Sequence, residues 1–199
     1  MKRCFKFAVL LALPVLAGCG GTTVKRVDTA EVIDISGKWN DTDSRLTAEE
    51  MIADCLSRPW IGEASANTGS KPSVIVGTVR NEGNEHINTG AFIEDLQRSL
   101  INSGRITFVA SKAERGELRD ERLEQSTNAS EETKKAHGAE IGADFMLSGT
   151  INTIEDKEGG KSVMLYQVNL KLLDVKTNQI VWNGQKKIKK SIKRSGSSW

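Results

Sequence analysis

Runs of apolar residues in the last third of the chain predict three β-strands. The first two runs span residues 144–154 and 162–175, and Gly159-Gly160 between them is typical of a hairpin turn. Residues 180–190 form the third run, after a short polar turn. The last third of the chain is therefore expected to be β-structure.

The second of these runs alternates between apolar and polar positions. Gln167, Asn169 and Lys171 separate the apolar residues of its second half. Such alternation predicts a strand with one face on the core and the other in water. The apolar positions are Met164, Tyr166, Val168, Leu170 and Leu172. In the third run, Ile180 and Trp182 are expected to point the same way.

The middle of the chain predicts a strand, a helix and a second strand. The β-rich residues 72–81 suit a central strand, and residues 105–111 form the next one. Between them, residues 89–104 have apolar side chains at helical spacing, and Gly104 is a natural stop for this helix. The expected buried stripe consists of Phe92, Ile93, Leu96, Leu100 and Ile101.

Three further segments carry helix signals. Residues 46–57 open with a capping box, in which Thr47 is the N-cap and Glu50 follows three positions later. Residues 112–125 are mostly charged, which predicts a solvated helix on the surface. A second short helix is expected over residues 128–142.

The order of these elements predicts an α/β (α+β) fold with a mixed β-sheet flanked by helices. The strand-like residues 29–36 are expected to pack on the domain. The chain has 199 residues and no internal repeat, so residues 30–199 are interpreted as one domain.

The N-terminus carries the pattern of a targeting signal. Basic residues precede an apolar run at 7–17, which is too short to span a bilayer as a helix. The letters "LAGC" that end at Cys19 look like a bacterial lipobox. Residues 1–18 are interpreted as a lipoprotein signal peptide, and residues 19–29 as a lipid anchor and short tether. The alternative is an ordinary secretory signal with a chance cysteine after its cleavage site.

Cleavage before Cys19 would change the charge of the chain. The full sequence has 28 Lys and Arg against 26 Asp and Glu, whereas the mature 181 residues would have 25 against 26. The basic excess thus belongs to the signal peptide and gives no argument for a nucleic-acid partner. Gly20 follows the cysteine, which by resemblance to enteric sorting rules favours the periplasmic face of the outer membrane.

Candidate catalytic chemistry is sparse. Cys55 would be the one thiol left beside an N-acyl diacylglyceryl Cys19, and its helical spacing predicts a buried hydrophobe. With His86 and His137 as the two imidazoles, we expect neither a zinc site nor a nucleophile–base pair. No phosphate-binding loop or hydrolase motif occurs, so we expect no cofactor, no metal and no enzymatic activity.

Two surface features are candidates for binding a partner. The strand near the C-terminus carries a basic run, in which lysines either guard a sheet edge against pairing or contact an acidic partner, phospholipid head groups or cell-wall polymers. Trp39 in "SGKWNDTDSR" either packs on the edge of its own core or anchors a partner. The candidate partner-binding residues are therefore Trp39, Lys186, Lys187, Lys189 and Lys190.

Taken in order, several stretches give the chain a family resemblance. They are "SGKWNDTD", "INTGAFIEDLQRSLINSGRITFVAS", "IGADFMLSGTI" and "QIVWNGQKKI". The chain resembles the LpoB family, the outer-membrane lipoprotein activators of penicillin-binding proteins, over roughly residues 30–190. The resemblance implies a periplasmic domain with a sandwich fold like those of TolB N-terminal and CsgG-like domains.

The resemblance also implies a function. A non-catalytic regulator would bind and activate a bifunctional class A penicillin-binding protein, a peptidoglycan synthase of the inner membrane. One alternative is a structural or secretion-linked lipoprotein of the CsgG type that assembles at the outer membrane, and another is a direct tether to peptidoglycan. Well-known members of the family have a long proline-rich stem, whereas residues 20–46 here contain no proline.

Overall fold

The computed structural model describes residues 22–129 and 140–193. Residues from Val32 onward belong to one compact unit, which is described here by itself. Its helices and strands are α1 (Asp41–Ser57), α2 (Trp60–Thr68), β1 (Ser73–Asn81), α3 (Thr89–Asn102), β2 (Thr107–Phe108), α4 (Lys112–Asn128), β3 (Phe145–Glu158), β4 (Lys161–Asp174) and β5 (Ile180–Lys193).

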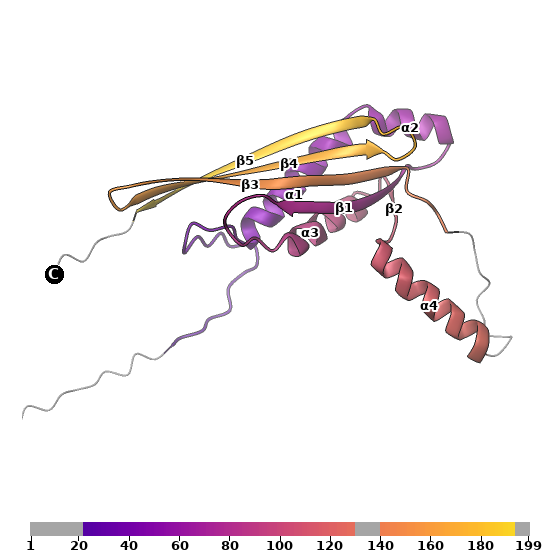
Figure 1. Ribbon diagram of the computed structural model, residues 1–199, viewed down its shortest axis with the longest axis horizontal. Helices are drawn as coiled ribbons and strands as arrows, with labels where there is room; N and C mark the ends of the chain where they lie inside the picture. Colours follow the sequence, from indigo (N-terminus) through magenta and orange to yellow (C-terminus); the bar gives the residue numbers. More distant parts are fainter. Residues whose placement is uncertain (1–21, 130–139, 194–199) are drawn as a thin grey trace, which may run out of the picture. The chain divides into compact units, whose positions relative to one another are not determined.

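The five strands form one mixed sheet in the order β2-β1-β3-β4-β5, so β5 is an edge strand (Figure 1). Strand β1 runs parallel to β2 and β3, whereas β3, β4 and β5 are antiparallel neighbours. Helices α1 and α3 pack against each other on one face of this sheet, with α3 against β1 and α1 against β5. The expected α/β (α+β) fold with a mixed sheet and flanking helices is confirmed.

The core lies between α1, α3 and the inner face of the sheet. Burial of each large apolar side chain there contributes about 1.5–3 kcal/mol to folding. The alternation predicted for β4 is confirmed, because Met164 and each second residue up to Leu172 are buried. Most of the predicted stripe of α3 is buried too, but Ile101 is half exposed on its last turn. The largest fully buried side chains include Tyr166, Phe92, Ile52, Leu96, Leu100 and Leu147.

The predicted start of the first helix is wrong by five residues. Helix α1 begins at Asp41, and its N-cap Asn40 accepts a hydrogen bond from the Asp43 amide at 3.0 Å while Asp43 accepts one from the Asn40 amide at 3.0 Å. This is a second capping box, earlier in the chain than the one at Thr47. Thr47 lies inside the helix with its side chain fully buried. The helix begins at the earlier capping box because this start also brings Asp43 within reach of β5.

Helix α2 was missed by the sequence analysis, which assigned no element to its residues. Pro59 precedes it. Gly69 ends it in the left-handed conformation, which glycine adopts without strain because it has no Cβ atom. These two residues were the available signals. Trp60 fixes the helix, because its indole donates to the Cys55 carbonyl at 2.7 Å and packs edge-on against Phe145.

Two other predicted elements are wrong. Residues 29–36 form no strand, and Val32 and Ile35 there are exposed. The short helix expected over residues 128–142 does not begin at its predicted start, because Asn128 ends α4; residues 130–139 lie outside the described residues. Helix α4 itself buries no residue, which confirms the solvated helix expected from its charges.

A bulge at the start of β5 reverses one side chain. Leu172 pairs with Trp182, but the next residue, Leu173, pairs with Ile180, so Val181 is an extra residue in the ladder. Trp182 is therefore buried, whereas Ile180 is 53 % exposed on the opposite face. The expectation that both point the same way is wrong, because simple alternation does not anticipate an extra residue.

Gly149, in the middle of β3, lies where β3 and β4 approach each other closely. A Cβ atom at this position would collide with the Asn169 carbonyl oxygen and with the Leu170 side chain. We expect Gly149→Ala to lower the free energy of unfolding by about 1–3 kcal/mol, the usual cost of overpacking. The measurement is the midpoint of urea unfolding of the full chain, monitored by circular dichroism.

Gly116→Ala in α4 is the matched control, because no heavy atom lies within 4 Å of its Cβ position. It should raise the free energy of unfolding by about 0.5–1 kcal/mol through helix propensity. Equal midpoints for Gly149→Ala and the wild type would contradict the close approach of the strands.

Candidate functional site

Three polar contacts join α1 to the edge strand β5. Asp43 contacts Lys190, Glu50 contacts Lys186, and Asp54 accepts a hydrogen bond from the Trp182 indole at 2.8 Å. The helix positions are seven and four residues apart, which returns them to one face of α1. The strand positions recur every fourth residue, so they share the inner face of β5. We call these three contacts the α1–β5 ladder.

Lys190 forms the more buried of the two ion pairs of the ladder, with only 9 % of its side chain exposed. Its Nζ lies 2.5 Å from Asp43 Oδ2 and 2.6 Å from Asp34 Oδ1, and it also donates to the Lys38 carbonyl at 3.1 Å. Burial alone would lower the pKa of Lys190, but the two carboxylates outweigh burial and raise it. Lys190 thus attaches the segment before α1 to the sheet.

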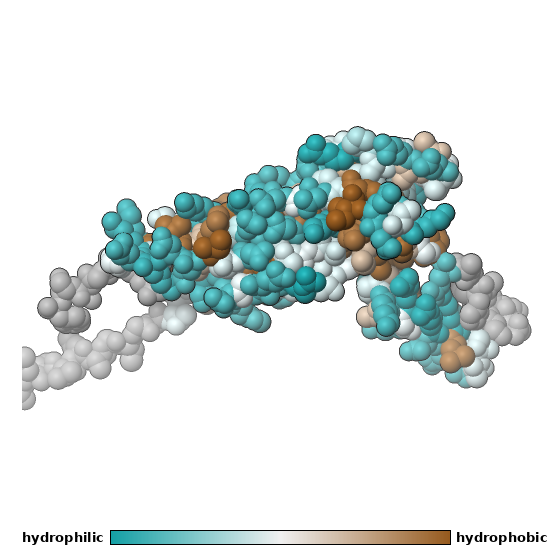
Figure 2. All heavy atoms as spheres, turned by 45° about the horizontal axis from the view of Figure 1, so that its top comes forward, coloured by the Kyte–Doolittle hydropathy of each residue, from teal (hydrophilic) through white to brown (hydrophobic). Residues whose placement is uncertain are grey.

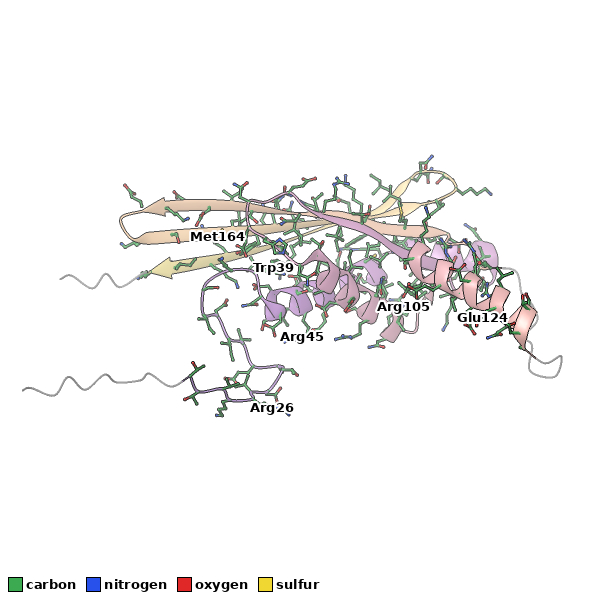
Figure 3. The ribbon with its side chains drawn as sticks, turned by 60° about the horizontal axis from the view of Figure 1, so that its bottom comes forward. Arg26, Trp39, Arg45, Arg105, Glu124 and Met164 are labelled. Atoms are coloured by element: carbon green, nitrogen blue, oxygen red, sulfur yellow. The ribbon has the colours of Figure 1, made fainter. Side chains whose placement is uncertain are left out.

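Trp39 belongs to the same attachment. Its backbone amide donates to Glu85 Oε1 at 2.9 Å, and the Tyr166 hydroxyl donates to Glu85 Oε2 at 2.5 Å. The indole packs edge-on against Tyr166 and Phe92, at ring-centroid distances of 5.5 and 5.9 Å. Burial and the Glu85 carboxylate raise the pKa of Tyr166, so its hydroxyl keeps its proton as the donor. Figure 3 shows Trp39 beside the strands.

The structure separates the residues proposed from the sequence as partner-binding. Trp39 is half-buried against its own core. Lys186 and Lys190 point to the inner face of β5 and contact carboxylates, whereas Lys187 and Lys189 are exposed on the outer face. The four lysines therefore form no single patch, and partner binding by these residues stays a prediction. Cys19 lies outside the described residues.

Sequence analysis missed Glu85, which accepts hydrogen bonds from both Trp39 and Tyr166. It lies in the polar loop "NEGNEHINTG", where nothing distinguishes it from the neighbouring acidic residues. Tyr166 offered a signal, because it is the one tyrosine of the chain and occupies an apolar position of β4. A buried hydroxyl needs a partner, but the sequence does not say which residue supplies it.

A cleft of about 640 Å³ lies beside this attachment, towards the β3–β4 hairpin. Ile35, Met164 and Ile192 contribute apolar side chains to it, and Lys38 and Lys157 are among its charged ones. Figure 3 labels Met164 on the hairpin side of Trp39. The remaining lining residues are polar or charged, so the apolar part of the cleft is small.

The described residues offer little for covalent or metal chemistry. Cys55 is 1 % exposed, and burial raises the pKa of its thiol to about 12, as expected for the buried hydrophobe predicted from its spacing. Within residues 22–129 and 140–193, three or more histidine, cysteine or acidic side chains nowhere gather as a metal site would require. The same residues include no helix long and apolar enough to cross a membrane.

The α1–β5 ladder predicts unequal roles for two lysines of one strand face. Lys190→Met leaves Asp43 and Asp34 without their cation, and we expect a loss of about 2 kcal/mol in the free energy of unfolding. Lys186→Met is the matched control: its partner Glu50 is 61 % exposed, so about 0–1 kcal/mol is expected. Urea unfolding at neutral pH measures both, and equal losses would contradict the ladder geometry.

The same ladder predicts a pH dependence. Because the folded pKa of Lys190 is raised, its stabilising contribution is complete below the unfolded pKa of about 10.4 and is lost as the pH rises through the folded pKa. The stability difference between the wild type and Lys190→Met should therefore shrink above about pH 10. A difference that stays constant from pH 8 to pH 11.5 would contradict this assignment.

Comparisons with solved structures find proteins to which this chain is similar. The solved C-terminal domain of LpoB from Escherichia coli is 18 % identical, with 73 % of this chain and 98 % of that chain covered and a TM-score of 0.41. The NMR structure of E. coli LpoB is 16 % identical, with coverages of 90 % and 89 % and a TM-score of 0.41. The PelC dodecamer from Paraburkholderia phytofirmans is 18 % identical, with coverages of 62 % and 75 % and a TM-score of 0.36.

No curated protein sequence matches the chain. The sequence model of one family does, and its description is "Peptidoglycan-synthase activator LpoB". The match covers residues 43–188, from the first turn of α1 to the middle of β5, and so includes β1 to β4, the first part of β5 and the α1–β5 ladder up to Lys186. The resemblance read from the sequence is thereby confirmed: the chain belongs to the LpoB family of peptidoglycan-synthase activators.

Proposed function

We propose that this protein is a lipid-anchored lipoprotein of the outer membrane that binds and activates a class A penicillin-binding protein from the periplasm. Membership in the LpoB family, matched over residues 43–188, carries this proposal. The protein acts without catalysis, by binding the active conformation of the synthase more tightly than the inactive one.

The N-terminal segment sets the reach of the domain in this proposal. Lys190 holds Asp34 on the folded unit, so residues 20–33 are the chain that can act as a tether from an acylated Cys19. Fully extended, these residues span about 50 Å. The domain therefore stays near the outer membrane, and a synthase anchored in the inner membrane must extend most of the way to meet it.

Lipid anchoring is tested by Cys19→Ser in the full-length protein. The wild type should incorporate radiolabelled palmitate and sediment with the outer membrane, because two or more acyl chains anchor stably. Cys19→Ser should lose the label and the membrane association. Palmitate incorporation by Cys19→Ser, or an unlabelled wild type, would exclude the anchor at this position.

Partner binding is tested by in vivo cross-linking of the tagged full-length lipoprotein, with mass spectrometry of the captured proteins. Recovery of a class A penicillin-binding protein is expected, together with a higher rate of glycan polymerisation when the purified synthase is mixed with the lipoprotein. Capture of only the lipoprotein itself or of outer-membrane proteins would show that the family fold serves another partner.

A further inference from the structure

One face of the sheet carries no packed helix among the described elements, and we call it the open face. Helices α1 and α3 pack on the inner face, where Val168, Leu170 and Leu172 are buried. The residues between these point the other way. The open face therefore consists of alternate residues of β1, β3, β4 and β5, beginning with Ile75, Met146, Leu173 and Ile180.

These first four residues form an apolar row across four strands. Each pairs with the next in the strand register, from Ile75 through Met146 and Leu173 to Ile180. Met146 is 38 % exposed and Ile180 is 53 % exposed. Because neighbouring strands lie about 4.8 Å apart, the row is roughly 14 Å long and one residue wide. Figure 2 shows hydrophobic side chains gathered at the end of the sheet where β4 ends and β5 begins.

The three rows that follow are polar or positively charged, and the fourth combines Lys189 with the apolar residues Ile154 and Leu165, of which Ile154 is 61 % exposed. Ser148, Lys171 and Asn183 form the next row, and Lys187 lies two rows further along β5. Neutral amides fill the space between, with Gln185 donating to Asn169 at 2.9 Å. The cations of these rows are Lys171, Lys187, Lys189 and Arg80, of which Arg80 pairs with Glu82 at 3.3 Å. Between the apolar row and Asp156, the open face of the described strands carries no carboxylate.

The two faces of β5 differ in how their lysines are neutralised. On the inner face, Lys186 and Lys190 contact carboxylates of α1 and of the segment before it. On the open face, no carboxylate among the described residues lies within ion-pair distance of Lys187 or Lys189, although both side chains are exposed. A positive field thus remains on the open face around Lys187 and Lys189, three and four rows from the apolar row.

We propose that the open face docks an acidic surface of the synthase that inserts one apolar side chain against the row from Ile75 to Ile180. This inference rests on the proposed function and adds the docking face and the chemistry of the partner. Carboxylates of the partner meet Lys171, Lys187 and Lys189, which speeds encounter, while the apolar row at one end of the face supplies the desolvated part of the contact. A second copy of this chain is unsuited as the occupant, because face-to-face contact would bring the like charges of both copies together.

The test measures affinity between the purified full-length lipoprotein in detergent and the class A synthase, by biolayer interferometry at about 100 mM salt. Lys187→Glu with Lys189→Glu should weaken binding about tenfold or more. The control is Lys71→Glu with Lys112→Glu, which changes the net charge equally at two exposed lysines outside the described strands and should change affinity less than twofold. Higher salt should weaken the wild type more than the Lys187/Lys189 variant.

The apolar row has its own matched pair. Ile180→Asp should weaken binding about tenfold, whereas Ile101→Asp should change it less than twofold, because Ile101 is 52 % exposed on α3 instead of the open face. Circular dichroism confirms that each variant is folded before its affinity is measured.

The outcomes separate the two proposals. No binding by the wild type would overturn the proposed function, and this inference with it. Wild-type binding with unchanged affinity of the open-face variants would overturn the inference alone. Self-association of the wild type that Ile180→Asp abolishes, seen by sedimentation velocity without the synthase, would assign the face to a second copy and also overturn it.

Discussion

The α1–β5 ladder is the contact on which the arrangement of the rest depends. An edge strand has a sheet neighbour on one side only, and β5 is rich in lysines that repel one another. Asp43 and Glu50 neutralise the lysines on its inner face, and Asp54 holds the Trp182 indole. The helical layer therefore extends over the edge of the sheet, and Lys190 in turn attaches the segment before α1.

Strand alternation gives one basic sequence run two physical roles. Successive side chains of β5 point to opposite faces, so neighbours such as Lys186 and Lys187 meet different surroundings. The inner lysines are balanced within the domain and contribute to its stability. The outer ones, Lys187 and Lys189, keep a field that an acidic partner can use, and they discourage a second sheet from pairing on this edge. Guarding the edge and contacting a partner are thus compatible.

Much of this fold could be predicted from the sequence because its strands and α3 follow simple periods. The pattern fails where a local choice is decided by distant residues. Asn40 and Thr47 both carry capping signals, and the earlier one prevails because Asp43 then reaches Lys190. The bulge that turns Ile180 outward has no periodic signature. The ladder and the open face were beyond reach for the same reason, since both depend on register between strands and on which helix covers which face.

The proposed mode of action fits a contact of moderate strength. An activator must favour one conformation of the synthase over another, so differential affinity matters more than tight binding. A row of half-exposed apolar side chains on the same face as lysines gives fast, salt-sensitive association with a small desolvated part. In the proposed arrangement, a tether of residues 20–33 adds a high local concentration of the domain near the outer membrane without any new contact. Because this tether spans only about 50 Å, the distance between the membranes itself limits which synthase molecules the open face can reach.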